Sequence, residues 1–155
     1  MEEYTQEQHG KDSKIYDPYP FIRKIIKTNF ILSCAVLTWG FTLATLNYKA
    51  CRSEKIVDET HLQEIIIEES KALDMKNKDI TGRFTEAPFG HGQAIKLDYN
   101  KYEIILDKKG RNRGVLKHEL YHILKGHAEE KDNLLIYLFI EEPQAALYGA
   151  YGIKL

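Results

Sequence analysis

Two histidines and the glutamate between them carry the clearest chemical potential in this sequence. His118-Glu119-Leu120-Tyr121-His122 forms an H-E-x-x-H pattern. On a helix, His118 and His122 are four residues apart and lie on one face, where two imidazoles can hold one Zn²⁺ at about 2.0–2.1 Å. Glu119 lies beside His118 and can take a proton from a metal-bound water. The spacing predicts a zinc site with His118 and His122 as ligands and Glu119 as the base.

The residues around the pattern predict the helix that would present it. Apolar side chains recur at helical period on the opposite face, at Leu116, Leu120, Ile123 and Leu124. Asn112 suits the start of this helix and Gly126 its end. A bare H-E-x-x-H also arises by chance, as two surface histidines around a glutamate. The amphipathic helix and the strand-like residues 102–106 before it favour the zinc interpretation.

A third protein ligand is expected, because a catalytic zinc usually has three and keeps one position open for water. The candidates after His122 are His127, Glu129, Glu130, Glu141 and Glu142. His127 would point about 140° away from His122 on a continuing helix, so a three-histidine site is rejected. Glu129 and Glu130 belong to a charge run that suits a solvated loop.

Glu142 is the favoured third ligand. It follows the apolar residues 133–140, which we expect to form a buried helix too short to cross a membrane. On a helix, Glu142 shares one face with Ala145, Ala146 and Gly149, and such small residues allow close approach to the motif helix. Glu141 would face elsewhere and remains the alternative ligand. Both glutamates could instead cap the helix start, where its dipole favours negative charge.

Residues 28–48 predict a single transmembrane helix. The stretch carries no charge and would be about 31 Å long, which matches a hydrocarbon core of about 30 Å. Basic residues flank it on both sides, four before and three after within fifteen residues, so the membrane orientation stays undetermined. The alternative is a soluble protein that buries this stretch in its core. Residues 1–27 are expected to form a flexible tail.

The rest of the chain predicts one ordinary domain over residues 58–155. Thr60 to Gln63 has the spacing of a capping box, and apolar residues then continue at helical period to about Leu73. Residues 80–85 suit a strand, and residues 95–106 suit a hairpin that turns at Tyr99-Asn100-Lys101. The net charge is −1, which gives no footprint for nucleic acid. Two cysteines, Cys34 and Cys51, would lie too far apart on a helix to form a disulfide.

The zinc motif and the later glutamate resemble gluzincin-type zinc metallopeptidases, most closely the small ImmA/IrrE-like enzymes and the membrane peptidases related to HtpX. His118-Glu119-Leu120-Tyr121-His122 fits fully, and Glu142-Pro143-Gln144-Ala145-Ala146 fits the E-x-x-A pattern of these families. Ala146 departs from it, because those families usually carry Asn or Asp there. The resemblance covers residues 58–155. It implies an α+β fold: a small metallopeptidase domain with a short antiparallel sheet and an active-site helix, here preceded by the transmembrane helix.

The main functional hypothesis is a membrane-anchored zinc endopeptidase that acts on a protein or peptide substrate. His118, His122 and Glu142 would bind Zn²⁺ and Glu119 would act on the water. Tyr148, Tyr151 and His91 are the candidates for stabilising the oxyanion. The alternative is a membrane-tethered zinc-binding interaction or regulatory module without turnover. The sequence leaves open the substrate, the oligomeric state and the side of the membrane that the domain faces.

Overall fold

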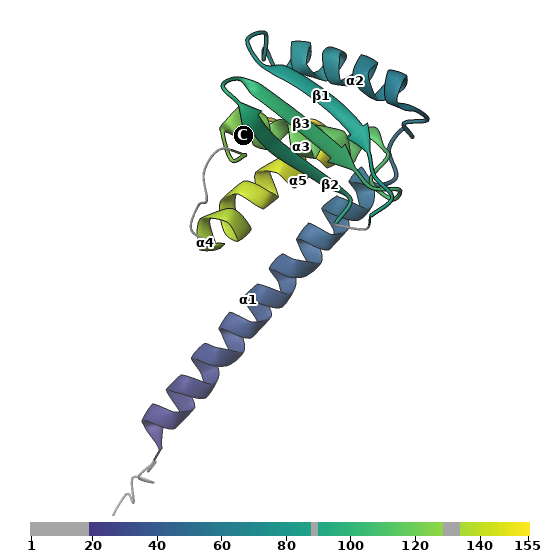
Figure 1. The fold of residues 1–155 in the computed structure, drawn as a ribbon. Helices are drawn as coiled ribbons and strands as arrows, with labels where there is room; N and C mark the ends of the chain where they lie inside the picture. Colours follow the sequence, from purple (N-terminus) through teal and green to yellow (C-terminus); the bar gives the residue numbers. More distant parts are fainter. Residues whose placement is uncertain (1–18, 88–89, 129–133) are drawn as a thin grey trace, which may run out of the picture. The chain divides into compact units, whose positions relative to one another are not determined.

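The computed structural model describes residues 19–87, 90–128 and 134–155, and the chain divides into two units, Met1–Leu37 and Thr38–Leu155. Figure 1 shows the order of the elements. The helices are α1 (Pro20–Ala50), α2 (Glu59–Ala72), α3 (Arg113–Lys125), α4 (Leu134–Ile136) and α5 (Glu142–Tyr151), with a π-helical turn, η1 (Tyr137–Glu141), between the last two. The strands are β1 (Asp79–Phe84), β2 (Gly92–Asp98) and β3 (Lys101–Leu106).

Helix α1 contains the apolar stretch 28–48 and is long and apolar enough to cross a membrane. Of the expected tail, residues 1–18 lie outside the described residues, whereas Pro20 begins the helix, as suits a proline in the first turn. The most apolar window of α1 is not buried among the described residues. Both cysteines are free, as expected.

Helix α2 begins two positions earlier than the capping box predicted. Asp58 is the N-cap, and its side chain accepts the backbone N–H of His61 at 2.8 Å. Thr60 therefore lies inside the first turn. Leu62, Ile65 and Ile66 are buried, which confirms the predicted apolar stripe.

The sheet is mixed, whereas the sequence predicted an antiparallel one. The hairpin of β2 and β3 is antiparallel as expected, but β1 pairs with β3 in parallel, giving the order β1-β3-β2. The hairpin occupies one edge of β3, and β1 takes the other edge. Strands β1 and β2 therefore run in opposite directions on the two sides of β3. Each strand was predicted, but the pairing partner of β1 was not.

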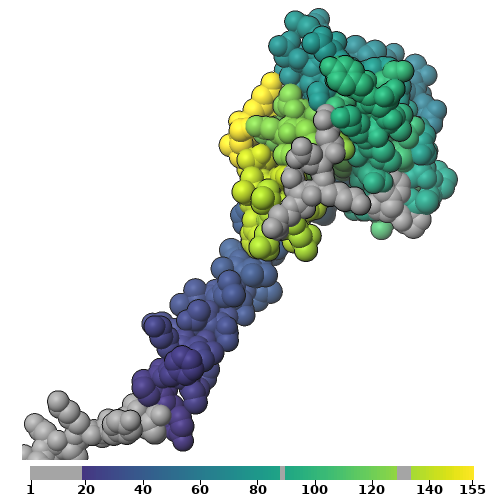
Figure 2. Space-filling view, turned by 60° about the vertical axis from the view of Figure 1, so that its left-hand side comes forward, coloured from purple at the N-terminus to yellow at the C-terminus, as the bar shows by residue number. Residues whose placement is uncertain are grey.

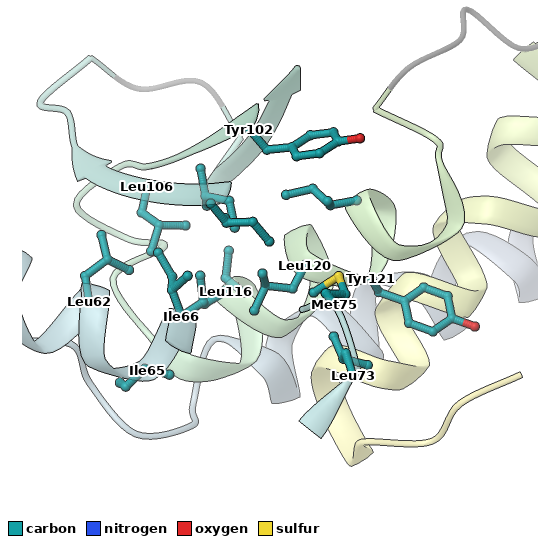
Figure 3. Close-up of a cluster of buried hydrophobic side chains, with 14 of the residues drawn as sticks. Leu62, Ile65, Ile66, Leu73, Met75, Tyr102, Leu106, Leu116, Leu120 and Tyr121 are labelled. Carbon is teal, nitrogen blue, oxygen red and sulfur yellow. The ribbon is translucent and has the colours of Figure 1, made fainter. Parts of the chain in front are cut away.

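One face of the sheet carries the hydrophobic core, and both α2 and α3 pack on it. Its members include Leu62 and Ile66 of α2, Tyr102 and Leu106 of β3 and Leu116 of α3, together with other buried side chains (Figure 3). A Cβ on Gly82 would lie 2.6 Å from Ile66, which shows how closely α2 approaches β1. Residues 102, 104 and 106 of β3 lie on the face that carries this core, at the period of two expected for a strand, and Ile105 on the other face is also buried.

Residues 134–140 are helical, as expected, but they are not buried. All seven side chains are exposed, from 39% at Leu138 to 66% at Leu134. The prediction of burial rested on their apolar character, which is equally consistent with contact with something outside the domain. Figure 2 shows this yellow-green segment next to the blue end of α1 that belongs to the same unit.

Candidate metal centre

Helix α3 presents the two histidines and the glutamate of the motif at one cleft. Its boundaries are those expected: Asn112 caps the start by accepting the N–H of Val115, and Gly126 ends the helix with a φ of 82°. The opposite face of α3 is anchored in the core. The Nε2 atoms of His118 and His122 lie 3.1 Å apart. Both imidazoles therefore point at one position.

Glu142 completes a group of three side chains. Its carboxylate oxygens lie 3.6 Å from Nε2 of His118 and 3.5 Å from Nε2 of His122. Helix α5 carries Glu142 close to α3 because small residues line the contact: Ala145 and Ala146 are fully buried. A Cβ on Gly149 would lie only 2.6 Å from the carbonyl oxygen of Gly114. The structure thus places the favoured residue, and the small residues behind it, where the sequence predicted.

These three donor atoms fit a tetrahedral divalent ion. Ligand atoms at about 2.0–2.1 Å from a tetrahedral zinc lie about 3.3 Å from one another. The two imidazole nitrogens lie 3.1 Å apart, Oε2 of Glu142 lies 3.6 Å from His118, and Oε1 of Glu142 lies 3.5 Å from His122. With one donor atom taken from each residue, the three atoms all lie within 4.8 Å of one another. Imidazole nitrogens and a carboxylate are also the donor set that zinc accepts. The chemistry and spacing of the group are therefore those of a site with three protein ligands.

The electrostatics of the site keep the donor atoms available to a cation. Burial lowers the pKa of His118 to about 4, and nearby His122 adds to this while Glu142 opposes it. Burial acts to raise the pKa of Glu142, but the hydrogen bonds from His122 and Tyr137 and the nearby His118 outweigh it and lower the pKa to about 2. At pH 7 the site holds a neutral His118 and an ionised Glu142, the protonation states that metal ligation requires.

Glu119 lies apart from the three donors in a different environment. It is 8% exposed and lines the same cleft, where Ala94 of β2 donates its backbone N–H to the carboxylate. Burial raises the pKa of Glu119 to about 7, with Glu142 acting in the same direction and His122 against it. A carboxyl group whose pKa lies near 7 is suited to accept and return a proton under ordinary conditions.

A second layer of side chains supports the group. Nδ1 of His122 lies 3.1 Å from Nδ1 of His127, and Glu141 lies 3.8 Å from the same atom of His127. His127 and Glu141, which the sequence had weighed as ligands, thus lie behind His122 instead of joining the three donors. Glu129 and Glu130 lie outside the described residues.

The π-helical turn η1 brings Tyr137 next to Glu142. The backbone N–H of Glu142 bonds to the carbonyl of Tyr137, five residues back, so these two residues lie one wide turn apart. The Tyr137 hydroxyl donates a hydrogen bond to the Glu142 carboxylate, and its ring stacks on His122 with centroids 6.2 Å apart. Reading the sequence missed Tyr137, because an ordinary helical period places it on another face.

The cleft beside the group has a volume of about 520 Å³. Strand β2 contributes one wall through Gly92, Gln93 and Ala94, and His91 lies next to it. Leu43, Asn47 and Ala50 of α1 contribute to another wall. The space is adequate for several residues of an extended chain, since binding pockets typically span about 300–1,000 Å³.

Of the three oxyanion candidates, the cleft includes only His91 among its lining residues. Its backbone N–H donates to Asp107 at 3.2 Å, which ties it to the turn before α3. Tyr148 is buried against Tyr121, with ring centroids 5.3 Å apart, and Tyr151 lies under the amine of Lys49 at 3.5 Å. Both tyrosines are therefore engaged away from the metal centre.

Comparisons with protein-family profiles, with curated proteins and with solved structures find no match to this chain.

Proposed function

We propose that this protein is a membrane-anchored, zinc-dependent endopeptidase, with α1 as a single transmembrane helix. His118, His122 and Glu142 would hold the zinc. The observation that carries the proposal is the position of the Glu142 carboxylate, 3.5–3.6 Å from Nε2 of both histidines. Helix α5 brings this carboxylate to the two histidines of α3, and Glu119 is not one of the three ligands and can act as a base. A hydrolytic zinc site needs this arrangement.

Glu119 would move the proton during peptide hydrolysis. Zinc, when bound, supplies a Lewis acid that activates water and polarises the scissile carbonyl. Glu119 accepts the proton that the attacking water loses as its oxygen bonds to the carbonyl carbon. The C–N bond then breaks, and Glu119 returns the proton to the leaving amine. The Ala94 N–H keeps the carboxylate aimed into the cleft during both transfers.

An extended peptide is the substrate that the cleft accommodates best. Strand β2 is the outer strand of the order β1-β3-β2, so among the described residues one of its edges pairs with no other strand. Its residues 92–94 also line the cleft next to Glu119. A peptide that pairs with this edge would run along the cleft and present its backbone carbonyls to the metal.

Metal binding and turnover can be tested separately in the full chain held in detergent or nanodiscs. We expect one zinc per wild-type chain, with the zinc lost in His118→Ala and in Glu142→Ala. Glu119→Gln should keep the zinc but lose cleavage of a peptide library, because only proton transfer is removed. His61→Ala, at the start of α2, is the matched histidine control and should behave as wild type. Wild-type protein that binds no zinc contradicts the proposal.

The second candidate is a tethered zinc-binding module without turnover. It is favoured by Ala146, which is fully buried and has no side-chain polar group, where the resembled families carry Asn or Asp. Such outer hydrogen bonds tune metal affinity and activity. Stoichiometric zinc together with no Glu119-dependent cleavage in the library experiment supports this candidate over the peptidase.

A further inference from the structure

The exposed segment Leu134–Ile140 is the one feature of this site that the proposed peptidase chemistry does not use. Its sequence, Leu-Leu-Ile-Tyr-Leu-Phe-Ile, contains no charged residue. Every one of its side chains is at least 39% exposed. Contiguous exposed apolar surface of this kind marks a contact with another apolar phase.

This segment contacts α1 at Trp39. The rings of Trp39 and Phe139 stack with centroids 5.9 Å apart, and the indole N–H of Trp39 donates to the carbonyl of Leu138 at 3.2 Å. Trp39, Leu43, Leu46 and Ala50 form the less exposed stripe of α1, at helical spacing. Phe41, between them, is 75% exposed and faces away. One face of this part of α1 therefore packs on the domain and the other is free for lipid.

Trp39 lies inside the uncharged stretch of α1. Tyr48 ends that stretch, and Lys49 and Arg52 follow it. Trp39 precedes Tyr48 by nine residues, which is about 13 Å along a helix. If the stretch occupies a bilayer, Leu138 and Phe139 lie at the same depth as Trp39, below the surface marked by the basic residues.

We infer that Leu134–Ile140 inserts into the lipid leaflet beside α1 and forms a second membrane contact of the domain. The inference rests on the membrane anchoring in the proposed function. These contacts favour lipid as the occupant, because the segment is uncharged and is held at the depth of the membrane helix. At seven residues it is too short to cross a bilayer, so it enters one leaflet only.

This contact would place the metal centre at the bilayer surface. Glu142 lies two residues after the end of the inserted segment, and Tyr137 within the segment donates to the Glu142 carboxylate. Leu138 of the inserted segment and Leu43 of the α1 stripe that packs on the domain both line the cleft. A substrate would therefore reach the zinc from the membrane surface.

Tryptophan quenching by brominated phosphatidylcholine in nanodiscs tests the inference, because the chain has a single tryptophan, Trp39. In a Trp39→Phe background, which keeps an aromatic ring against Phe139, a tryptophan is introduced by Phe139→Trp or by Leu135→Trp. The matched control is Ile67→Trp in the same background. Ile67 is 63% exposed on α2, which lies apart from α4 in the domain (Figure 1). Zinc stoichiometry and circular dichroism establish that each variant folds.

We expect brominated lipid to quench the tryptophans at positions 139 and 135 to an extent comparable with Trp39 in the wild type, and to leave the one at 67 bright. Suppose brominated lipid quenches Trp39 in the wild type, but the tryptophans at positions 139 and 135 stay as bright as the one at position 67. The inference that Leu134–Ile140 enters the lipid is then overturned, whereas α1 as a membrane anchor is supported. A concentration-dependent dimer in that case would identify a second copy as the occupant. An unquenched Trp39 in the wild type would instead refute the anchoring itself.

Discussion

Nδ1 of His122 lies 3.1 Å from Nδ1 of His127, on the side of the imidazole away from the three-donor group. One nitrogen of His122 is thereby directed at the proposed metal and the other at a fixed partner. When Nδ1 of His122 donates to His127, Nε2 is left unprotonated, as a ligand requires. His127 is therefore placed to fix both the tautomer and the ring orientation of His122.

Replacing His127 should weaken metal binding without removing a ligand. We expect His127→Ala to lower zinc affinity by about 10–100-fold, the range found for partners behind metal-binding histidines. Competition with a chromophoric chelator measures this, with His61→Ala as the histidine control. An affinity equal to that of the wild type would show that the contact with His122 has no role in the site.

Gly92 tests whether the edge of β2 sets the position of the catalytic base. A Cβ at this position would lie 2.7 Å from a carboxylate oxygen of Glu119 and 2.8 Å from Val115. Gly92→Ala should displace Glu119, costing about 1–3 kcal/mol of stability through overpacking. Peptide turnover should fall by roughly 100-fold, as when a general base is misplaced.

The same variant should still bind zinc, because none of the three donors is touched. Gly40→Ala is the matched control, since nothing lies within 4 Å of a Cβ added there. Turnover and zinc content are measured side by side. Full activity in Gly92→Ala would mean that Glu119 does not act from the position described.

Asp107 should make the stability of the domain depend on acidic pH. The side chain is buried and accepts backbone N–H groups from Lys109 and Gly110, both at 2.8 Å, as well as from His91. Burial acts to raise the pKa of Asp107, but these hydrogen bonds and nearby His91 outweigh it and lower the pKa below its ordinary 3.8. A carboxyl group with a lowered folded-state pKa stabilises the fold above the unfolded-state value, and this stability is lost as the pH falls through the folded pKa.

We therefore expect the free energy of unfolding to fall below about pH 3.8 in the wild type, with Asp107 contributing to the fall. Asp107→Asn should lack this contribution and should lose about 1–3 kcal/mol at neutral pH, because one of the two acceptor oxygens is replaced by an NH2 group that cannot accept a backbone N–H. Urea unfolding in micelles at several pH values measures both effects. Asp74→Asn is the control at an exposed aspartate, and an equal response from the two variants would contradict the assignment.

Arg113 should be the main electrostatic link between α3 and α2. Its guanidinium lies 2.6–2.7 Å from the carboxylate of Glu69, which is only 3% exposed, and it also pairs with the more exposed Glu68. Arg113→Met would leave Glu69 with Lys117 at 3.3 Å as its remaining cation. We expect a loss of about 3 kcal/mol, because a buried carboxylate loses its main partner.

Glu68→Ala removes the exposed partner of the same arginine and serves as the control. Its expected cost is below about 1 kcal/mol, as for other surface ion pairs. Chemical unfolding of both variants gives the comparison. Equal costs would show that the burial of Glu69 does not determine the strength of the link.

Local patterns in the sequence determined the helix of the metal centre almost completely. Asn112, Gly126 and the apolar stripe predicted the bounds of α3, because capping and helical period depend only on residues within a few positions. The hairpin of β2 and β3 followed from alternation and a short turn for the same reason. The four-residue spacing alone brought His118 and His122 to one face.

Only the tertiary structure decided how distant parts meet. Glu142 was favoured from the sequence, but its 3.5–3.6 Å separation from the two histidines depends on the packing of α5 on α3. The π-helical turn that brings Tyr137 to Glu142 and the parallel pairing of β1 have no local signal. The exposure of residues 134–140 was predicted wrongly, because an apolar run indicates an apolar neighbour without identifying which one. Spacing along the chain determines a helix face, whereas long-range packing decides what that face meets.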